Sequence, residues 1–337
     1  MMAGTVRTIT QSRAEPVTPV TAGTAREPAF EKVVIVTRKT ELESLVERFS
    51  TVGQARFYLE QAGQTFEPIA AQHQVYHQAL DQIRRTVPKG MKHQVIERAL
   101  VPQYAFQPTD LIITVGPDGL VVNVAKYAGL QPILAVNPDP RVIDGVLLPF
   151  SLQQLGGALQ NALTGAGRIT PVTLANARLN DGQHLLAFND LFIGASSHVS
   201  ARYHLRQGEQ HEQHSSSGVI VTTGAGSTGW LQSVYAGAAG IITALGGTVH
   251  WPENRGRLPW DTDHLVYTVR EPFPSKTSQT RMVFGLITRD QPLVIDSHMA
   301  LNGVIFSDGI EQDYLQFNAG ATVTIGLAPQ KARLLVP

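Results

Sequence analysis

The pattern of hydrophobic residues changes near residue 170, and this change restricts the folds that the chain can adopt. Before it, apolar runs at 32–38, 110–116 and 132–136 alternate with segments of helical periodicity. Unbroken apolar runs are typical of parallel strands that are buried on both faces. We therefore expect residues 30–150 to form an α/β domain with a parallel sheet.

Helices are predicted between and after these strands. The first begins after Thr40, because Thr40 and Glu43 have the spacing of a capping box. A second, at 67–87, carries apolar residues at helical spacing. Two more are expected at 119–129 and 151–163, and the last of these leads away from the sheet.

From about residue 170, short apolar runs follow one another, and Gly, Asn, Asp or Ser separates most of them. Such runs predict an antiparallel β domain, interrupted by a helix near 228–244. We assign residues 151–327 to this second domain and residues 328–337 to a C-terminal strand or tail. The expected strands lie at 171–179, 184–193, 200–206, 218–223, 264–270, 281–288, 292–297, 300–307, 313–318 and 321–327.

Composition excludes several classes of function. The chain has 27 Lys plus Arg and 27 Asp plus Glu, so no net charge attracts nucleic acid or an anionic membrane. It has no cysteine, which excludes disulfides and thiol nucleophiles and is typical of a reducing compartment such as the cytoplasm. No apolar run approaches the ~20 residues of a transmembrane helix. Residues 1–29 are rich in Thr, Ala and Pro and are expected to be a disordered leader; Glu15 and Glu27 make a transit peptide a weaker alternative.

Residues 218–237, GVIVTTGAGSTGWLQSVYAG, predict a strand, a glycine-rich turn and a helix. A helix start has unpaired N–H groups and the positive end of the helix dipole, so such a turn is a common anion site. A tight turn without a ligand explains these residues equally well. The spacing of Gly224, Gly226 and Gly229 also matches the dinucleotide fingerprint G-x-G-x-x-G, but the next acidic residue, Glu253, lies in a loop-like segment. We therefore reject a Rossmann interpretation of these glycines.

The expected strand 111–115 runs directly into Gly116-Pro117-Asp118-Gly119-Leu120. The carboxyl end of a parallel strand is where α/β folds bind their ligands. Backbone N–H groups of the glycines would hold phosphate there, and Asp118 would face a hydroxyl group. The commoner role for such a residue is a plain helix N-cap, and the residues alone favour that role.

Two polar segments interrupt the β domain. Asn189-Asp190 lies inside the apolar run LLAFNDLFIG, where polar side chains need partners. One explanation is that the pair lies on an edge strand or at a bulge. The more specific alternative is that the pair binds the hydroxyl and amine groups of a sugar and a base. Ser307-Asp308-Gly309 is interpreted as a hairpin turn.

His211 and His214 lack the H-E-x-x-H spacing that places two ligands on one helix face, and they lie in a segment interpreted as a solvated polar hairpin loop. No metal ligand is predicted in the chain. Ser227 has no neighbouring His or acid to activate it, so a serine hydrolase is not expected.

Taken together, these segments resemble the NAD kinase family, and within it the mitochondrial-type branch. The resemblance rests on their order along residues 32–327: a strand with Gly-x-Asp-Gly, then VNPDP, FNDLFIG, SSSG with GAGSTGW, VREP and SDG. Residues 116–120 match the family's Gly-Gly-Asp-Gly-Thr motif, and Asn189-Asp190 matches its Asn-Glu motif. Residues 226–230 match its Gly-Ser/Thr-Thr-Ala-Tyr motif.

The resemblance implies a two-domain fold of the NAD kinase and diacylglycerol kinase type. It also implies an enzyme, a phosphotransferase that moves the γ-phosphate of ATP, with Mg²⁺, to the 2′-hydroxyl of the adenosine ribose of NAD or NADH. Asp118 would be the catalytic residue, and Gly116 and Gly119 would bind the phosphates of ATP. The dinucleotide would contact Asn189, Asp190, Ser217, Gly226, Ser227, Thr228 and Trp230.

Three further expectations follow from the resemblance. Asp118, Asn189 and Thr228 are expected to face one cleft between the domains. The family commonly forms homodimers or homotetramers, so a homo-oligomer is expected. A lipid kinase of the same superfamily is an alternative, although the Asn-Asp and GAGSTGW segments favour the NAD branch.

The chain departs from the family at the expected phosphate-donor loop. Pro117 replaces a glycine and removes one N–H donor, and Leu120 replaces a threonine and removes a hydroxyl. Ser217 stands where many members have Asp. Two hypotheses are therefore kept: an active NAD(H) kinase, and a dinucleotide-binding pseudokinase or regulator with weakened or lost transfer.

Overall fold

The first part of the chain forms a parallel sheet, as the sequence predicts. The computed structural model describes residues 30–251 and 253–337, so the predicted leader 1–29 lies outside the described residues. In the order β4-β3-β1-β2, all neighbouring strands run parallel, and β4 also pairs with the short β5. Their bounds are β1 Lys32–Thr37, β2 Lys92–Glu97, β3 Asp110–Val115, β4 Pro132–Asn137 and β5 Phe150–Ser151.

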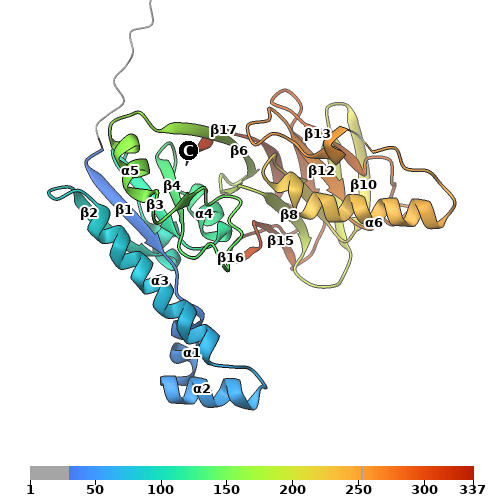
Figure 1. Ribbon diagram of the computed structural model, residues 1–337. Helices are drawn as coiled ribbons and strands as arrows, with labels where there is room; N and C mark the ends of the chain where they lie inside the picture. The colour runs from blue at the N-terminus through green and yellow to red at the C-terminus, as the bar shows by residue number, and fades with distance from the viewer. Residues whose placement is uncertain (1–29, 252) are drawn as a thin grey trace, which may run out of the picture.

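Helices cover both faces of this sheet (Figure 1). Tyr76 and Ile83 of α3 pack with Leu155 of α5 against one face, and Leu120 and Val124 of α4 pack against the other. The predicted path of α5 away from the sheet is therefore wrong, because its apolar side chains belong to the first core. The helices are α1 Glu41–Phe49, α2 Val52–Gln61, α3 Glu67–Thr86, the 3₁₀ helix η1 Arg98–Gln103, α4 Asp118–Ala125 and α5 Leu155–Leu163.

The last strand joins the two parts of the molecule. β17, Thr322–Val336, pairs with β14 near its start and runs parallel to β4 near its end, with an irregularity between Leu327 and Lys331. The segments predicted at 321–327 and 328–337 are thus one continuous strand. Through it the first sheet continues in the order β10-β9-β14-β17-β4, with β6 and β7 alongside. These strands are β6 Arg168–Leu179, β7 His184–Ala187, β9 Ala201–Gln207, β10 Gln210–Ser216 and β14 Leu293–Ser297.

A second sheet of six antiparallel strands packs on this extension, as predicted for the β domain. Side chains from both sheets fill the space between them, including Leu205 and Ile295 on one side and Ile193 and Val221 on the other. α6, Trp230–Ala244, follows β11 and lies over the outside of the sandwich (Figure 1). The strands, in spatial order, are β13 Phe284–Ile287, β12 Leu265–Val269, β11 Val219–Thr222, β8 Asp190–Ala195, β15 Gly303–Ser307 and β16 Ile310–Gln316.

Two strands have too few apolar residues to be recognised in the sequence. β2 lies at the edge of the sheet, and the side chains of its first three residues are exposed. β10 was expected to be a solvated loop, and this is wrong for Glu212 and His214, whose side chains are 3% and 0% exposed. Glu212 accepts N–H bonds from Arg281 and Met282, which satisfies the buried carboxylate, while His211 remains exposed.

No helix within residues 30–251 and 253–337 is long and apolar enough to cross a membrane.

Candidate active site

Three parallel strands end at one hollow of about 200 Å³. Arg38 follows β1, Gly116 and Pro117 follow β3, and Asp139 follows β4, and all four residues line the hollow. They meet because the carboxyl ends of parallel strands lie at the same edge of a sheet. A guanidinium group beside a glycine-containing loop is suited to an anionic ligand.

The Gly116–Gly119 loop begins α4, but Asp118 is not its N-cap. Pro117 occupies the N-cap position with φ −75° and ψ 170°, and it makes no capping side-chain bond. Asp118 is the first residue of the helix, and its two carboxylate oxygens accept N–H bonds from Val146 at 3.2 Å and Leu147 at 2.8 Å. These bonds fix the carboxylate and leave lone pairs on both oxygens for a ligand.

The two departures from the family motif differ in their structural consequences. Pro117 lines the hollow and has no N–H to offer there. Leu120 is 2% exposed and packs with Val121 and Val124 in the core on the α4 face of the sheet. Leu120 is thus a core residue, and its side chain is not among those that line the hollow.

A half-buried carboxylate, that of Asp308, organises the Asn189-Asp190 segment. Asp308 lies in the predicted hairpin turn between β15 and β16, with a left-handed φ of 57°. Its oxygens accept N–H bonds from Phe188 at 3.0 Å, Asn189 at 2.7 Å and Asp190 at 3.2 Å. Burial raises the pKa of Asp308, although the N–H donors and the nearby Lys126 oppose this effect. The turn therefore holds two predicted site residues in place.

Asn189 and Asp190 differ in how their side chains are engaged. Asp190 accepts a 2.6 Å hydrogen bond from the Thr222 hydroxyl on the neighbouring strand. Burial raises the pKa of Asp190 to about 7, and the negative charge of Asp308 adds to this effect. The half-buried Asn189 side chain makes no hydrogen bond within the described part of the chain, so its amide is available to a ligand.

The C-terminal end of α4 connects the two halves of the candidate site. Lys126 Nζ lies 2.9 Å from Asp313 Oδ2, and Tyr127 donates a hydrogen bond to the same oxygen. Phe188 and Ala225 also pack in the same apolar cluster as Leu120 of α4. The helix that begins at Asp118 therefore shares an apolar cluster with Phe188, which precedes Asn189, and with Ala225, which lies in the turn before Thr228.

The glycine turn after β11 is shaped by chain packing. A Cβ atom at Gly224 would lie 1.9 Å from the carbonyl oxygen of Pro259, and one at Gly226 would lie 2.3 Å from that of Asn189. Ser227 is buried; its hydroxyl donates to Gly224 O at 2.7 Å and accepts from Leu258 N at 2.9 Å. These two glycines admit neighbouring backbone, which favours the structural interpretation of the turn at those positions. β11 pairs antiparallel with both neighbours, so a Rossmann βαβ unit is excluded here.

Trp230 and Arg270 line a second hollow, of about 520 Å³. The Trp230 ring lies nearly parallel to that of Phe192, with centroids 6.1 Å apart, and the Arg270 guanidinium lies 5.7 Å from the Trp230 centroid. Ser217 is exposed, and its N–H donates to Arg270 O at 2.9 Å. Thr228 is also exposed, on the turn that leads to Trp230.

The predicted site residues therefore fall into three neighbouring groups. Gly116, Asp118 and Gly119 belong to the α4 end, the Asn189-Asp190 pair lies at the Asp308 turn, and the 226–230 turn leads to Trp230. Of these residues, Gly116 lines the first hollow, and Asp118, Gly119, Asn189 and Thr228 do not. The sequence analysis did not identify Arg38, Lys126 or Asp308 as site residues. Arg38 could have been identified because it directly follows the first buried strand. No local sequence pattern indicates Lys126 or Asp308.

The chain is similar in sequence to several curated proteins, although no protein-family model matches it. It is 25% identical over 224 residues to the probable NADH kinase of Oryza sativa subsp. japonica, which covers 59% of this chain and 63% of that protein. It is 23% identical over 262 residues to NAD kinase 2, mitochondrial, of Rattus norvegicus, which covers 63% of this chain and 62% of that protein. The matches thus span less than two thirds of these relatives.

Solved structures share the fold. Yeast NADH kinase, solved in complex with NADH, superposes with a TM-score of 0.59 at 13% identity and covers 92% of this chain and 84% of its own. The Archaeoglobus fulgidus NAD kinase, solved in complex with ATP, gives a TM-score of 0.50 at 16% identity, over 90% of this chain and 93% of its own. The sequence relatives are thus named NAD or NADH kinases, and the solved structures share the two-domain fold of this chain.

Proposed function

We propose that the protein is an NAD(H) kinase, which transfers the γ-phosphate of ATP to the 2′-hydroxyl of the adenosine ribose of NAD or NADH. One observation carries the proposal furthest. The Asp118 carboxylate lies at the carboxyl edge of the parallel sheet, on a helix whose other end is bonded to Asp313 of the β domain. A carboxylate in that position can act on a hydroxyl held by one domain while the other binds a phosphate donor.

The donor half of the proposed site is the hollow at the ends of β1, β3 and β4. ATP phosphates would lie against Gly116 and Gly119, with the Arg38 guanidinium supplying positive charge. Phosphoryl transfer depends mainly on positioning and charge neutralisation, so an Arg and glycine N–H groups suit this role. Asp118 would orient the ribose hydroxyl or accept its proton.

The acceptor half would use the β domain. The free amide of Asn189 and the Asp190–Thr222 pair supply donors and acceptors for adenine or ribose groups. Thr228 and Trp230 offer an exposed hydroxyl and an aromatic face to the rest of the dinucleotide, with Ser217 nearby. Gly226 and Ser227 would shape the turn, since both are already packed or hydrogen-bonded inside it.

Mg²⁺ fits the donor set of this proposal. Mg²⁺ in such sites is held by one or two carboxylates together with substrate phosphates. Asp118 provides a carboxylate whose oxygens keep free lone pairs beside the loop. When bound, the ion would neutralise phosphate charge, and the residues of the chain would orient the hydroxyl and the nucleotide.

The proposal is tested with purified protein, ATP, Mg²⁺ and either NAD or NADH, by following NADP(H). Formation of NADP(H) is expected with at least one of the two acceptors. Phosphorylation of diacylglycerol in place of both would support the lipid kinase alternative. Repeating the assay with polyphosphate in place of ATP identifies the phosphate donor.

The second candidate function is a dinucleotide-binding protein with weakened or lost transfer. It is favoured by Pro117, which lines the donor hollow without an N–H, and by the burial of Leu120 where the family has a hydroxyl. Such a protein would bind NAD or NADH by calorimetry and form no NADP(H) from any donor.

We also propose a homo-oligomer. The α6 helix contains no charged residue. Ile241 on α6 and Leu245 directly after it are 64% and 84% exposed, which supports association through the β domain. Light scattering on a sizing column measures the mass directly. The cytoplasmic location remains a prediction, and imaging of a tagged chain would test it against the mitochondrial location in the name of the rat relative.

A further inference from the structure

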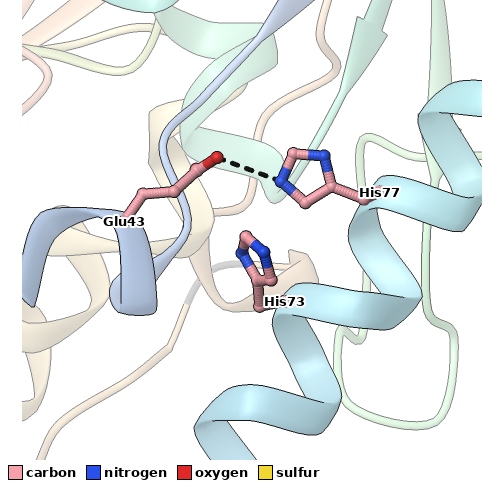
Figure 2. Close-up of side chains that lie close together, drawn as sticks. All are labelled: Glu43, His73 and His77. Carbon is pink, nitrogen blue, oxygen red and sulfur yellow. Dashed lines mark hydrogen bonds and ion pairs between the residues drawn. The ribbon is translucent and has the colours of Figure 1, made fainter. Parts of the chain in front are cut away.

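Two histidines and a glutamate meet between α1 and α3 (Figure 2), and one of them, His73, also lines the donor hollow. His73 and His77 are four residues apart on α3, so they lie on one face of that helix. Glu43 approaches them from α1. One potential ligand atom from each of the three residues lies within 4.8 Å of the other two.

The surrounding hydrogen bonds orient two of these side chains. One Glu43 oxygen accepts the N–H of Thr40 at 2.7 Å in the capping box, and the other accepts a 3.0 Å hydrogen bond from His77 Nε2. His73 Nδ1 lies 2.8 Å from the Thr40 hydroxyl. A rigid helix cap thus presents one carboxylate oxygen to the two imidazoles.

We propose that Glu43, His73 and His77 form a binding site for a zinc-class divalent metal ion. Two imidazoles and one carboxylate are a common zinc donor set, and the fourth position is then left to water or another ligand. Ligand atoms around tetrahedral zinc are about 3.3 Å apart, since zinc–nitrogen bonds are about 2.0–2.1 Å. The Glu43–His77 separation of 3.0 Å is close to this spacing, and a ligand atom of His73 lies within 4.8 Å of both.

The metal can reach this site from solvent. The side chains of His77 and Glu43 are 44% and 36% exposed, and all three ligands line one open hollow of about 560 Å³. Glu47 and Glu97 line the same hollow together with Arg38, Lys39 and Arg84, so its wall carries charges of both signs and the two histidines and Glu43 alone would select the ion. Imidazole ligands favour zinc, cobalt or nickel over Mg²⁺, which prefers oxygen.

A bound metal would tie α1 to the helix that supports the donor hollow. Tyr76 lies between the two histidines; its hydroxyl donates to Val115 O at 3.0 Å and accepts the N–H of Arg38 at 2.9 Å. The same turn of α3 therefore carries the metal ligands and the group that holds the ends of β1 and β3. α1 and α2 project from the α/β domain, so a cross-link there restrains the most peripheral helices (Figure 1).

Calorimetric titration with ZnCl₂ tests the proposal, using wild type, Glu43→Gln, His77→Gln and His73→Gln. His184→Gln is the matched control, because His184 is exposed at the start of β7. Wild type and the control should bind one zinc ion at this site. Each ligand variant should bind at least about 100-fold more weakly, since loss of a partner that only orients a ligand already costs about 10–100-fold. MgCl₂ should give no binding at this site.

Hydrogen exchange locates the ion independently of activity. Zinc should slow exchange of the α1 amides, Glu41–Phe49, in wild type and leave α5 unchanged. The ligand variants are measured below their melting temperatures, and circular dichroism confirms that they are folded. Zinc binding of equal strength in wild type and all three ligand variants would overturn the proposal. The proposal would also be overturned if zinc slowed hydrogen exchange elsewhere in the protein but not at the α1 amides.

Discussion

Lys126 and Asp313 form an ion pair of 2.9 Å across the boundary between the α/β domain and the β domain. The Lys126 side chain is 1% exposed, and Tyr127 shares the same carboxylate oxygen. A single helix thus has Asp118 at its first turn and an inter-domain bond at its other end. This bond and the apolar cluster that contains Leu120 and Phe188 both join α4 to the β domain next to Asn189.

Lys126→Met should destabilise the protein by about 3 kcal/mol, because it leaves a carboxylate and a hydroxyl with no cation in a largely buried place. Urea denaturation measures the change. The double variant Lys126→Met with Asp313→Leu should be more stable than the single variant, since no unpaired charge remains. Equal stability of Lys126→Met and wild type would show that the ion pair does not hold the two domains together.

Asp118→Asn should reduce phosphate transfer by about 10²–10⁴-fold, as expected when a general base is removed. Affinity for NAD or NADH should change little. Asn keeps one oxygen to accept an N–H from Val146 or Leu147, so the loop stays near its native position. Turnover assays and calorimetric titration measure the two effects separately. Unchanged turnover would leave Asp118 with a structural role only, as the acceptor for the 146–147 backbone.

Local sequence patterns predicted most of the elements that form the site. The strand before Gly116 and the capping box at Thr40 are visible as an apolar run and a spacing, and both are present. β10 could not be recognised, because Glu212 and His214 are polar residues that only distant partners make acceptable in a core.

The contacts that assemble the site are long-range and have no local signature. Asp308 and Asn189 are 119 residues apart, and their hydrogen bond depends on how β8 and β15 pair. Lys126 and Asp313 are 187 residues apart. The role of Leu120 was also hidden, because a single residue type does not reveal whether it faces the sheet or the hollow.

The contribution of Asp190 to the free energy of unfolding should fall as the pH rises from about 4 to 7. Burial raises the pKa of Asp190 to about 7, above its usual value of 3.8, so the folded state binds the proton more tightly than the unfolded state. The stabilisation that protonated Asp190 contributes is therefore complete below about pH 4 and is lost as the pH rises through about 7. It amounts to a few kcal/mol at most, since each pKa unit is worth about 1.4 kcal/mol.

Asp190→Asn should flatten this part of the pH profile, measured by urea denaturation at pH 5, 6, 7 and 8. A smaller slope should remain, because the pKa of Asp308 is raised by burial as well. Asp290→Asn, at an exposed bend, is the control and should follow wild type. A variant profile as steep as that of wild type would contradict the assignment to Asp190.

Pro117→Gly should raise kcat/KM for ATP and leave the Kd for NAD unchanged. The substitution restores an N–H at a position that lines the donor hollow, where one such donor is worth about 3 kcal/mol, or about 100-fold in rate. Leu120→Thr is not included, because Leu120 is buried and its truncation would open the core. Pro140→Gly is the control, since it also replaces a proline after a β strand, but Pro140 does not line the hollow.

Comparison of the kinetics of wild type and Pro117→Gly decides between an active kinase and a protein that binds the dinucleotide without transferring phosphate. Proline fixes its own φ near −65° and restricts Gly116 before it, so the native loop can be better ordered than a glycine loop. Wild-type kinetics for ATP as good as those of Pro117→Gly would mean that Arg38 and this ordered loop compensate for the missing N–H. Absence of transfer by both proteins, from ATP and from polyphosphate, with NAD binding intact, would favour the dinucleotide-binding regulator. A rate gain in Pro117→Gly alone, absent from Pro140→Gly, would identify residue 117 as the position that limits the donor half of the site.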